Sequence, residues 1–255
     1  MNPIDLGSAF ADEEVAWLYQ YRAPYPRAVF GILERLLVEP RVVLDAGTGT
    51  GALARNLPSS VVRIDAIDPS AAMLARGRAR SRGDDPRIRW ILGRAEDAPL
   101  SPPYGLITAG ASLHWMQPDK VLPRFQNALA PDARLAVVDT ETTHAGAWRR
   151  EILDVIRRYS PLEHHEETHE MVARYTRLGI FTLEGEERTA PEPFDQSIDE
   201  YLRLLGSTST LSRVTLGPRA AAFESECRAL FARHGMDRVR SDVVGYIAWG
   251  RPTTG

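Results

Sequence analysis

Short apolar runs alternate with segments of helical spacing through the first 140 residues. Five of these runs are short and rich in aliphatic and β-branched residues, as strands are: 41–46, 61–67, 87–92, 106–109 and 134–139. Helical spacing follows the second and fourth of them, at 71–80 and 118–130. Strands that alternate with helices pair in parallel through right-handed crossovers. The pattern therefore predicts an α/β fold built on a mostly parallel sheet.

The pattern changes after Thr140. Two segments, 181–190 and 238–249, alternate like strands, and four are helical by their spacing: 148–159, 162–178, 198–205 and 219–233. Residues 11–38 also have helical spacing, which Pro24 and Pro26 interrupt. We predict one domain over 1–255, with an N-terminal helical lid at 1–40 and helical cap insertions at 141–178 and 195–216.

Composition narrows the class of protein. The net charge is −3, and no dense block of basic residues stands out, which disfavours a nucleic-acid partner. No apolar run reaches the length of about 18 residues that a membrane span needs, and the start of the chain lacks a secretory pattern. Cys227 is the only cysteine, which suits the cytosol. We expect a cytoplasmic, bacterial protein, a monomer or homodimer, without membrane contact.

A turn with alternating glycines follows the first predicted strand. The run from Val42 to Gly51 reads V-V-L-D-A-G-T-G-T-G, and a helix-compatible segment, 52–57, comes next. Glycines let backbone N–H groups approach a ligand, and a helix N-terminus adds partial positive charge. This strand, loop and helix are typical of a fold that binds a nucleoside-containing cofactor.

The residues leave two cofactors open. Gly47, Gly49 and Ala52 satisfy the G-x-G-x-x-A form of a dinucleotide fingerprint, so NAD fits the motif. Asp45, however, ends the strand where it can reach an ammonium group, which S-adenosylmethionine carries and NAD lacks. Asp68 lies nineteen positions after Gly49, close to the spacing of an acid that accepts from ribose hydroxyls. The alternative for Asp68 is a helix N-cap.

The run D-A-G-T-G-T-G resembles the first motif of class I S-adenosylmethionine-dependent methyltransferases. Residues 93–99, G-R-A-E-D-A-P, resemble the segment of that family that receives the adenine, although a polar loop would look alike. Three further segments are similar to UbiE-like enzymes of the trans-aconitate methyltransferase type: Y-R-A-P-Y-P at 21–26, L-H-W at 113–115 and A-W-G-R-P at 248–252. Where many relatives have an aspartate near the start of the fourth strand, this chain has Gly105.

The resemblance implies a Rossmann-like, seven-stranded, mostly parallel sheet with an antiparallel C-terminal edge hairpin and a helical cap. It also implies S-adenosylmethionine as cofactor. The residues that it assigns to cofactor binding are Tyr21, Arg22, Asp45, Ala46, Gly47, Thr48, Gly49, Gly51, Asp68, Pro69, Met73, Ala95, Glu96, Gly110 and Trp115.

His114 is the best-placed titratable group for catalysis, because it follows a parallel strand at the edge where ligands bind. It could act as acid or base or orient a substrate; otherwise it contacts cofactor or packs beneath it. Trp115 could wall a pocket or pack in the core. Tyr21 and Arg22 could close over the methionine end of the cofactor, or end a surface helix. His164, His165 and His169 have metal-ligand spacing, but surrounding glutamates indicate a solvated face, and we predict no metal.

The sequence thus predicts methyl transfer from S-adenosylmethionine to a small-molecule acceptor, with oxygen or carboxylate favoured and nitrogen or carbon allowed. Secondary metabolism is an expectation at the level of the family. An NAD-dependent oxidoreductase is one alternative, although Lys120, the only lysine, lies near no tyrosine in the sequence. A non-catalytic cofactor-binding protein is the other.

Overall fold

The computed structural model describes residues 6–144, 146–162 and 166–253. Contacts divide the chain into two compact units. The sheet unit comprises residues 24–141, 166–191 and 244–255. The helical unit comprises residues 1–23, 142–165 and 192–243. Both units are therefore assembled from segments that lie far apart in the sequence.

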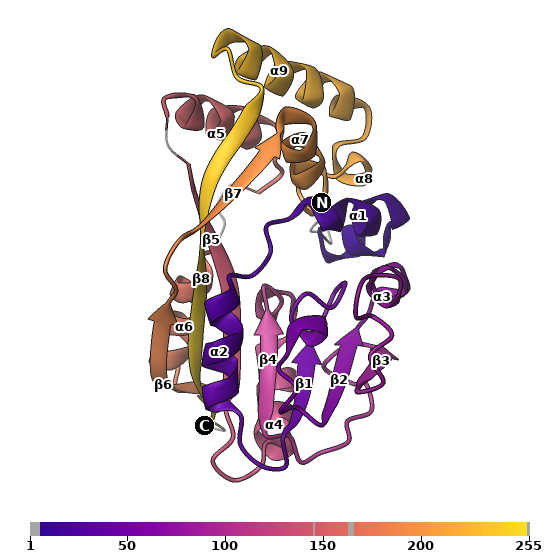
Figure 1. Ribbon diagram of the computed structural model, residues 1–255, viewed down its shortest axis with the longest axis vertical. Coiled ribbons are helices and arrows are strands. Elements are labelled where there is room, and N and C mark those ends of the chain that lie inside the picture. The colour runs from indigo at the N-terminus through magenta and orange to yellow at the C-terminus, as the bar shows by residue number, and fades with distance from the viewer. Residues whose placement is uncertain (1–5, 145, 163–165, 254–255) are drawn as a thin grey trace. The chain divides into compact units, whose positions relative to one another are not determined.

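The sheet has the strand order β3-β2-β1-β4-β5-β8-β6 (Figure 1). The five strands that come first in the chain pair in parallel, as predicted: β1 (Val42–Ala46), β2 (Arg63–Asp68), β3 (Ile88–Leu92), β4 (Leu106–Gly110) and β5 (Leu135–His144). In register, Ala46 lies beside Ile67 and Asp45 lies beside Thr108. The carboxyl ends of β1, β2 and β4 consequently share one edge, where ligands of such sheets bind.

The prediction of seven strands is wrong, because the described residues form eight. The antiparallel edge is confirmed, but it is not a single hairpin. β8 (Arg238–Pro252) pairs with β6 (Phe181–Arg188) through its second half and with β7 (Glu192–Ser197) through its first half. β7 was missed because its sequence, E-P-F-D-Q-S, contains a proline and two acids and lacks β-branched residues. β7 is a strand only because β8 is long enough to extend beyond β6 and pair with it.

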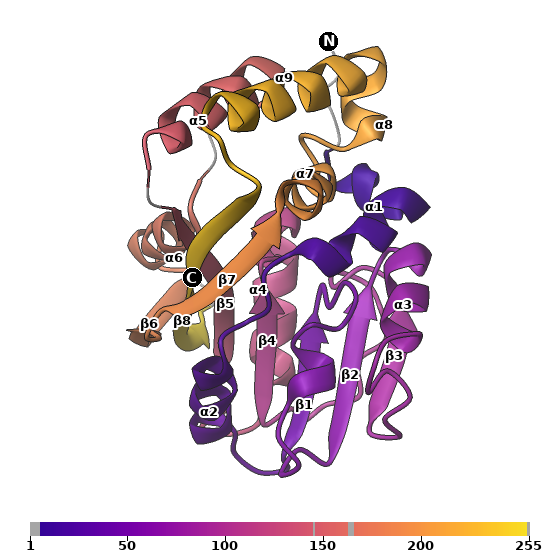
Figure 2. The same cartoon turned by 45° about the horizontal axis from the view of Figure 1, so that its top comes forward.

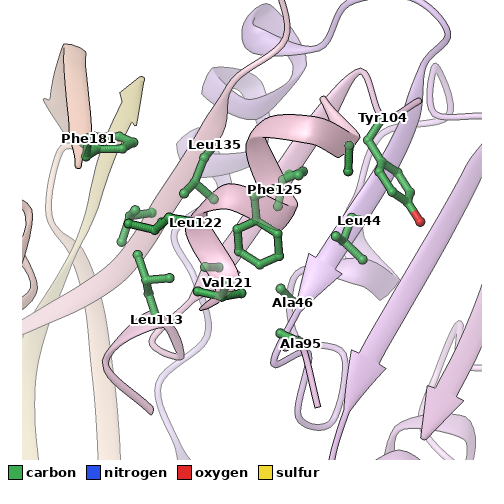
Figure 3. Close-up of a cluster of buried hydrophobic side chains, with 14 of the residues drawn as sticks. Leu44, Ala46, Ala95, Tyr104, Leu113, Val121, Leu122, Phe125, Leu135 and Phe181 are labelled. Carbon is green, nitrogen blue, oxygen red and sulfur yellow. The ribbon is translucent and has the colours of Figure 1, made fainter. Parts of the chain in front are cut away.

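Helices cover both faces of the sheet. On one face, Val121, Leu122 and Phe125 of α4 (Pro118–Ala128) pack against Leu44 and its neighbours (Figure 3). α6 (Thr168–Arg177) contributes to the same cluster. On the other face, α2 (Arg27–Leu36) buries its apolar side against β1, β2 and β4. β1 is buried throughout, which explains its continuous apolar run.

The helical unit has an aromatic interior. It contains α1 (Glu13–Leu18), α5 (Trp148–Tyr159), α7 (Ile198–Gly206), α8 (Arg213–Leu216) and α9 (Ala220–Arg233). α5 and α9 lie side by side (Figure 2). The ring of Trp148 meets those of Tyr201 and Phe231 at centroid distances of 6.3 and 5.6 Å. Of the predicted lid and cap, α1, α5 and α7 lie in this unit, whereas α2 and α6 pack in the sheet unit. That the helical unit acts as a cap stays a prediction.

Two local features bear on the predictions: the segment after the glycine loop and Gly105. The segment 52–57 is not an α-helix: turns lead into a short 3-10 helix, Ala54–Asn56. The expected contribution of a helix N-terminus to ligand binding is therefore wrong. Gly105 stands where a side chain has no room, since a Cβ there would lie 2.0 Å from the carbonyl oxygen of Val38. Among the described residues, no helix has the length and apolarity that crossing a bilayer requires.

Candidate functional site

The glycine loop after β1 is built from left-handed backbone. Gly47, Gly49 and Gly51 have φ angles of +66°, +56° and +75°. A Cβ on Gly47 would lie 2.5 Å from Cβ of Ser112, and one on Gly51 would lie 2.4 Å from the ring of Trp90. Conformation and close packing both demand glycine at these two positions. The loop consequently presents backbone rather than side chains at the sheet edge.

Asp45 is buried beneath this loop. Its oxygens accept hydrogen bonds from the hydroxyl of Thr48 at 2.5 Å and that of Thr108 at 2.7 Å. Burial raises the pKa of Asp45, and the hydrogen bonds from Thr48, Thr108 and the N–H of Ala54 offset part of that rise. Asp45 thus fastens the loop to β4 and places negative charge under it. Its direct contact with an ammonium group stays a prediction.

Asp68, at the end of β2, connects two loops. Its Oδ2 accepts from the backbone N–H of Gly49 and its Oδ1 from that of Ser70, both at 2.8 Å. Burial raises the pKa of Asp68, the two backbone bonds lower it in part, and the charge of Asp45 raises it further. The N-cap of α3 (Ala71–Arg78) is Ser70, which accepts from the N–H of Met73. The capping alternative for Asp68 is therefore wrong.

The loop after β3 is tied to the loop after β4. Glu96 accepts a hydrogen bond from the N–H of Gln117 at 2.9 Å, just before α4 begins. Burial raises the pKa of Glu96, but bonds from the backbone N–H groups of Gln117 and of Glu96 itself, and from Arg94, outweigh it, so the net pKa lies below its usual value. Ala95 and Met73 are buried, and Pro69 is exposed. Glu96 is consequently an acid with a lowered pKa whose hydrogen bond to Gln117 fixes its position at this edge.

The segment after β4 carries the predicted catalytic residue. Ser112 donates to the carbonyl of Ala46 at 2.7 Å, and a 3-10 helix, Leu113–Trp115, follows. His114 is exposed, and its ring lies 4.8 Å from that of Trp115. Trp115 is 40% exposed, so its alternative as a core residue is wrong. Both side chains are thus exposed in the segment that follows the carboxyl end of β4.

Tyr21 and Arg22 belong to the helical unit and are bonded there. Nε and Nη2 of Arg22 donate to the hydroxyl and carbonyl of Ser207 at 3.0 and 2.9 Å, and Nη1 donates to Tyr19. The hydroxyl of Tyr21 accepts from Arg203 at 2.8 Å. The two residues thus fasten the N-terminal segment to α7, and their contact with cofactor stays a prediction.

Sequence reasoning missed three residues that shape the site: Trp90, Thr108 and Ser112. None belongs to a motif. The register of β1 with β4 places Thr108 beside Asp45, which only the paired strands reveal. Trp90 packs against both Gly51 and Gly77. His164 and His165 of the histidine motif lie outside the described residues, and the described part of the chain holds no cluster of three metal-ligating side chains.

Comparison with known proteins bears on this edge of the sheet. Residues 43–132 match the family described as methyltransferase domain. An uncharacterized methyltransferase of Mycobacterium tuberculosis is 32% identical over 119 residues, which are 46% of this chain and 47% of that protein. A malonyl-[acyl-carrier protein] O-methyltransferase of Halalkalibacterium halodurans is 32% identical over 104 residues, 38% of each chain. The chain thus aligns with less than half the length of these relatives.

A solved structure described as a type II methyltransferase of Anaeromyxobacter dehalogenans has the same fold. It superposes with a TM-score of 0.60 and 24% identity, over 90% of this chain and 97% of that one. The family match covers β1 to the end of α4, and so includes the glycine loop, Asp68, Glu96 and His114.

Residues 43–132 are thus similar to a methyltransferase domain, and the sheet has the fold of a solved methyltransferase structure. S-adenosylmethionine is accordingly the cofactor of this methyltransferase domain. The residues present fit that cofactor. Asp45 and Asp68 are buried carboxylates that form no ion pair within the described residues. Buried charges are normally paired, so this negative charge suits a ligand that carries cationic ammonium and sulfonium groups.

Proposed function

We propose that the whole chain transfers a methyl group from S-adenosylmethionine to an oxygen of a small organic acceptor, with a carboxylate favoured. One observation carries the proposal: the carboxylate of Asp68 is held between the N–H groups of Gly49 and Ser70. A carboxylate offers roughly four acceptor sites. Two are used, and two remain for the pair of ribose hydroxyls.

The reaction asks the protein mainly for alignment. The bound cofactor supplies a methyl group already activated by its positively charged sulfur. The glycine loop, Asp68 and Glu96 fix the position of the nucleoside, so that acceptor and methyl group meet in line. If the acceptor is a hydroxyl, His114 can remove its proton. A carboxylate acceptor is ionised at neutral pH and needs no base.

Two observations favour this proposal over an NAD-dependent oxidoreductase. A pyrophosphate binds at the N-terminus of a helix, whereas here a three-residue 3-10 helix, Ala54–Asn56, follows the loop. The N–H of Gly49, which a pyrophosphate would require, already donates to Asp68. A carboxylate so close to the loop would also repel phosphate oxygens.

The acceptor is proposed from chemistry and from one relative. The Halalkalibacterium protein is named as an O-methyltransferase of malonyl-[acyl-carrier protein], which supports an oxygen acceptor here. We further propose a small-molecule substrate, a cytoplasmic location and a monomer or homodimer, without nucleic acid as the methyl acceptor.

Calorimetry and methyl transfer test the proposal in sequence. The chain should bind S-adenosylhomocysteine and not NADH. Binding of NADH without S-adenosylhomocysteine would contradict the proposal and favour an oxidoreductase. Radiolabelled methyl from S-adenosylmethionine should then appear in a panel of carboxylic acids and alcohols. Tight cofactor binding with no transfer to either class would favour the non-catalytic alternative. His114→Gln should slow transfer to alcohols and spare transfer to carboxylates, since only the former need a base.

A further inference from the structure

Five arginines gather near the glycine loop, on the second half of α3, in the segment after it and in the 3-10 helix Ala54–Asn56. They are Arg55, Arg76, Arg78, Arg80 and Arg82, and we call them the arginine patch. Arg55 donates to the carbonyls of Thr50 and Ser81, at 3.0 and 2.8 Å. The prediction that the chain has no dense basic block is wrong, because R-G-R-A-R-S-R at 76–82 is one, and the fold adds Arg55 to it.

The patch has no ion-paired acid of its own in the described part of the chain, although the hydrogen bond from Arg87 and, to a lesser extent, the charge of Arg82 lower the pKa of the nearby Asp85. Within the described residues, none of the five arginines forms an ion pair, whereas half of the arginines of the helical unit do. Burial lowers the pKa of Arg55, and the charges of Arg80 and Arg82 lower it further. The pKa of Arg80 is lowered by burial and by Arg76. The nearest ion-paired acid in the sequence, Asp85, is held by Arg87 at 2.7 Å.

The structural role of these arginines explains only part of the patch. Arg55 and Arg78 donate to backbone carbonyls. The C-terminus of α3 carries a partial negative charge of about half an elementary unit, which favours nearby arginines. The guanidinium groups of Arg76 and Arg80 donate to no group in the described part of the chain. At least the charges of Arg76 and Arg80 therefore have no ion-pair partner among the described residues.

The side chains fit a carboxylate-bearing surface better than a nucleic acid. Arg76, Arg78 and Arg82 are exposed, and each guanidinium can grip a carboxylate with two parallel hydrogen bonds. Single-stranded nucleic acids are held by bases stacked on aromatic rings. Trp90, the aromatic residue beside the patch, packs its ring against Gly51 and Gly77 and therefore does not offer it for stacking on a base. The chain as a whole carries a charge of −3, which disfavours an extended polyanion beyond the patch.

We propose that the arginine patch is a docking surface for an acidic protein partner, one that presents several carboxylates on a helix or loop. Charge complementarity selects the partner, and none of the five arginines belongs to the glycine loop after β1 or to the 3-10 helix after β4. The proposal does not depend on which acceptor the enzyme methylates.

Fluorescence anisotropy with labelled poly-L-glutamate tests the proposal on the full chain with S-adenosylhomocysteine bound. The triple variant Arg76→Gln/Arg78→Gln/Arg82→Gln should bind the probe about tenfold more weakly, the combined effect of three modest exposed charge pairs. The control Arg150→Gln/Arg177→Gln/Arg240→Gln removes the same charge from exposed positions elsewhere and should change affinity less than about twofold. Unchanged S-adenosylhomocysteine affinity of both variants shows that they fold.

Several results would overturn the proposal. One is an equal loss in both variants, which means that only net charge matters. Others are no measurable binding of poly-L-glutamate by the native chain, or stronger binding of a thymidine oligonucleotide of matched charge, which would make the patch a nucleic-acid surface. Replacement of the same three residues by lysine keeps the charge; an intermediate affinity supports recognition by the arginine fork.

Discussion

The two units of this protein share exposed ion pairs but differ in their interiors. In the sheet unit, Asp45 and Asp68 are buried without a cationic partner among the described residues. In the helical unit, charged side chains lie at the surface and pair with one another, as Arg228 does with Asp199 and Glu224, while the interior is aromatic. The sheet unit retains an electrostatic cost that a cationic ligand can relieve, whereas the helical unit is built as a self-sufficient core. Buried acids without an ion-pair partner among the described residues thus distinguish the candidate cofactor site.

Truncation of the aromatic interior should give the largest effect. Trp148→Ala removes a side chain that is 5% exposed and should destabilise the protein by about 3–5 kcal/mol. Urea unfolding followed by circular dichroism measures the loss. Trp17→Ala, in the same unit but 39% exposed, is the control and should cost much less. Equal losses would mean that burial does not distinguish the two rings.

Gly51→Ala should have the second largest effect on stability. Its backbone has a positive φ, and the added Cβ would clash with the ring of Trp90. We expect the free energy of unfolding to fall by about 2–4 kcal/mol, the sum of strain at positive φ and overpacking. Gly179→Ala is a matched control in the same unit: its φ is +70°, but a Cβ there meets nothing within 4 Å. The control should lose about 1 kcal/mol from strain alone. If both variants lose the same, Trp90 does not buttress the loop.

Asp68→Ala should weaken S-adenosylhomocysteine binding by at least about tenfold, since it removes the acceptor for the ribose and frees the N–H of Gly49. Asp68→Asn keeps one oxygen acceptor and should lose less. Calorimetry gives both affinities, and thermal unfolding shows whether the fold survives. An unchanged affinity in the alanine variant would remove Asp68 from the cofactor site.

The pH dependence of cofactor binding should follow the buried acids. The pKa values of Asp45 and Asp68 are raised in the folded protein, so their protonation on acidification begins above the usual range of an aspartate. Because the raised values favour the neutral acids in the fold, these groups contribute stability at low pH that is lost as pH rises through the folded pKa. Affinity for the cationic S-adenosylmethionine should show the opposite trend and fall on acidification. S-adenosylhomocysteine lacks the sulfonium charge and should lose less; parallel losses would contradict the electrostatic account.

The smallest effect is expected on the surface of the helical unit. Arg228→Ala breaks exposed pairs with Asp199 and Glu224 and should change stability by less than about 1 kcal/mol. Cofactor affinity should stay as it is. A loss as large as that of Asp68→Ala in cofactor affinity would erase the contrast between the two units.

The parallel sheet and its glycine loop followed from the sequence, because strand runs and positive-φ glycines are local properties. β1 was predicted within one residue of its start, and Pro118–Ala128 within two residues of its end. β7 could not be predicted, because its polar sequence becomes a strand only through pairing with β8. The helix expected at 52–57 failed for the same kind of reason: packing beneath the loop, not local propensity, decides how the chain leaves Gly51.

By itself, the sequence determined the five parallel strands, the three glycines that turn the chain after β1, and the acids at or next to the ends of β1 and β2. Only the tertiary structure decided what those residues do to one another. The bond from Gly49 to Asp68 crosses nineteen positions, that from Thr108 to Asp45 crosses sixty-three, and the arginine patch joins Arg55 to residues 76–82. Backbone conformation is set by neighbours in the chain, whereas charge balance and hydrogen-bond partners depend on which distant segments the sheet register brings together.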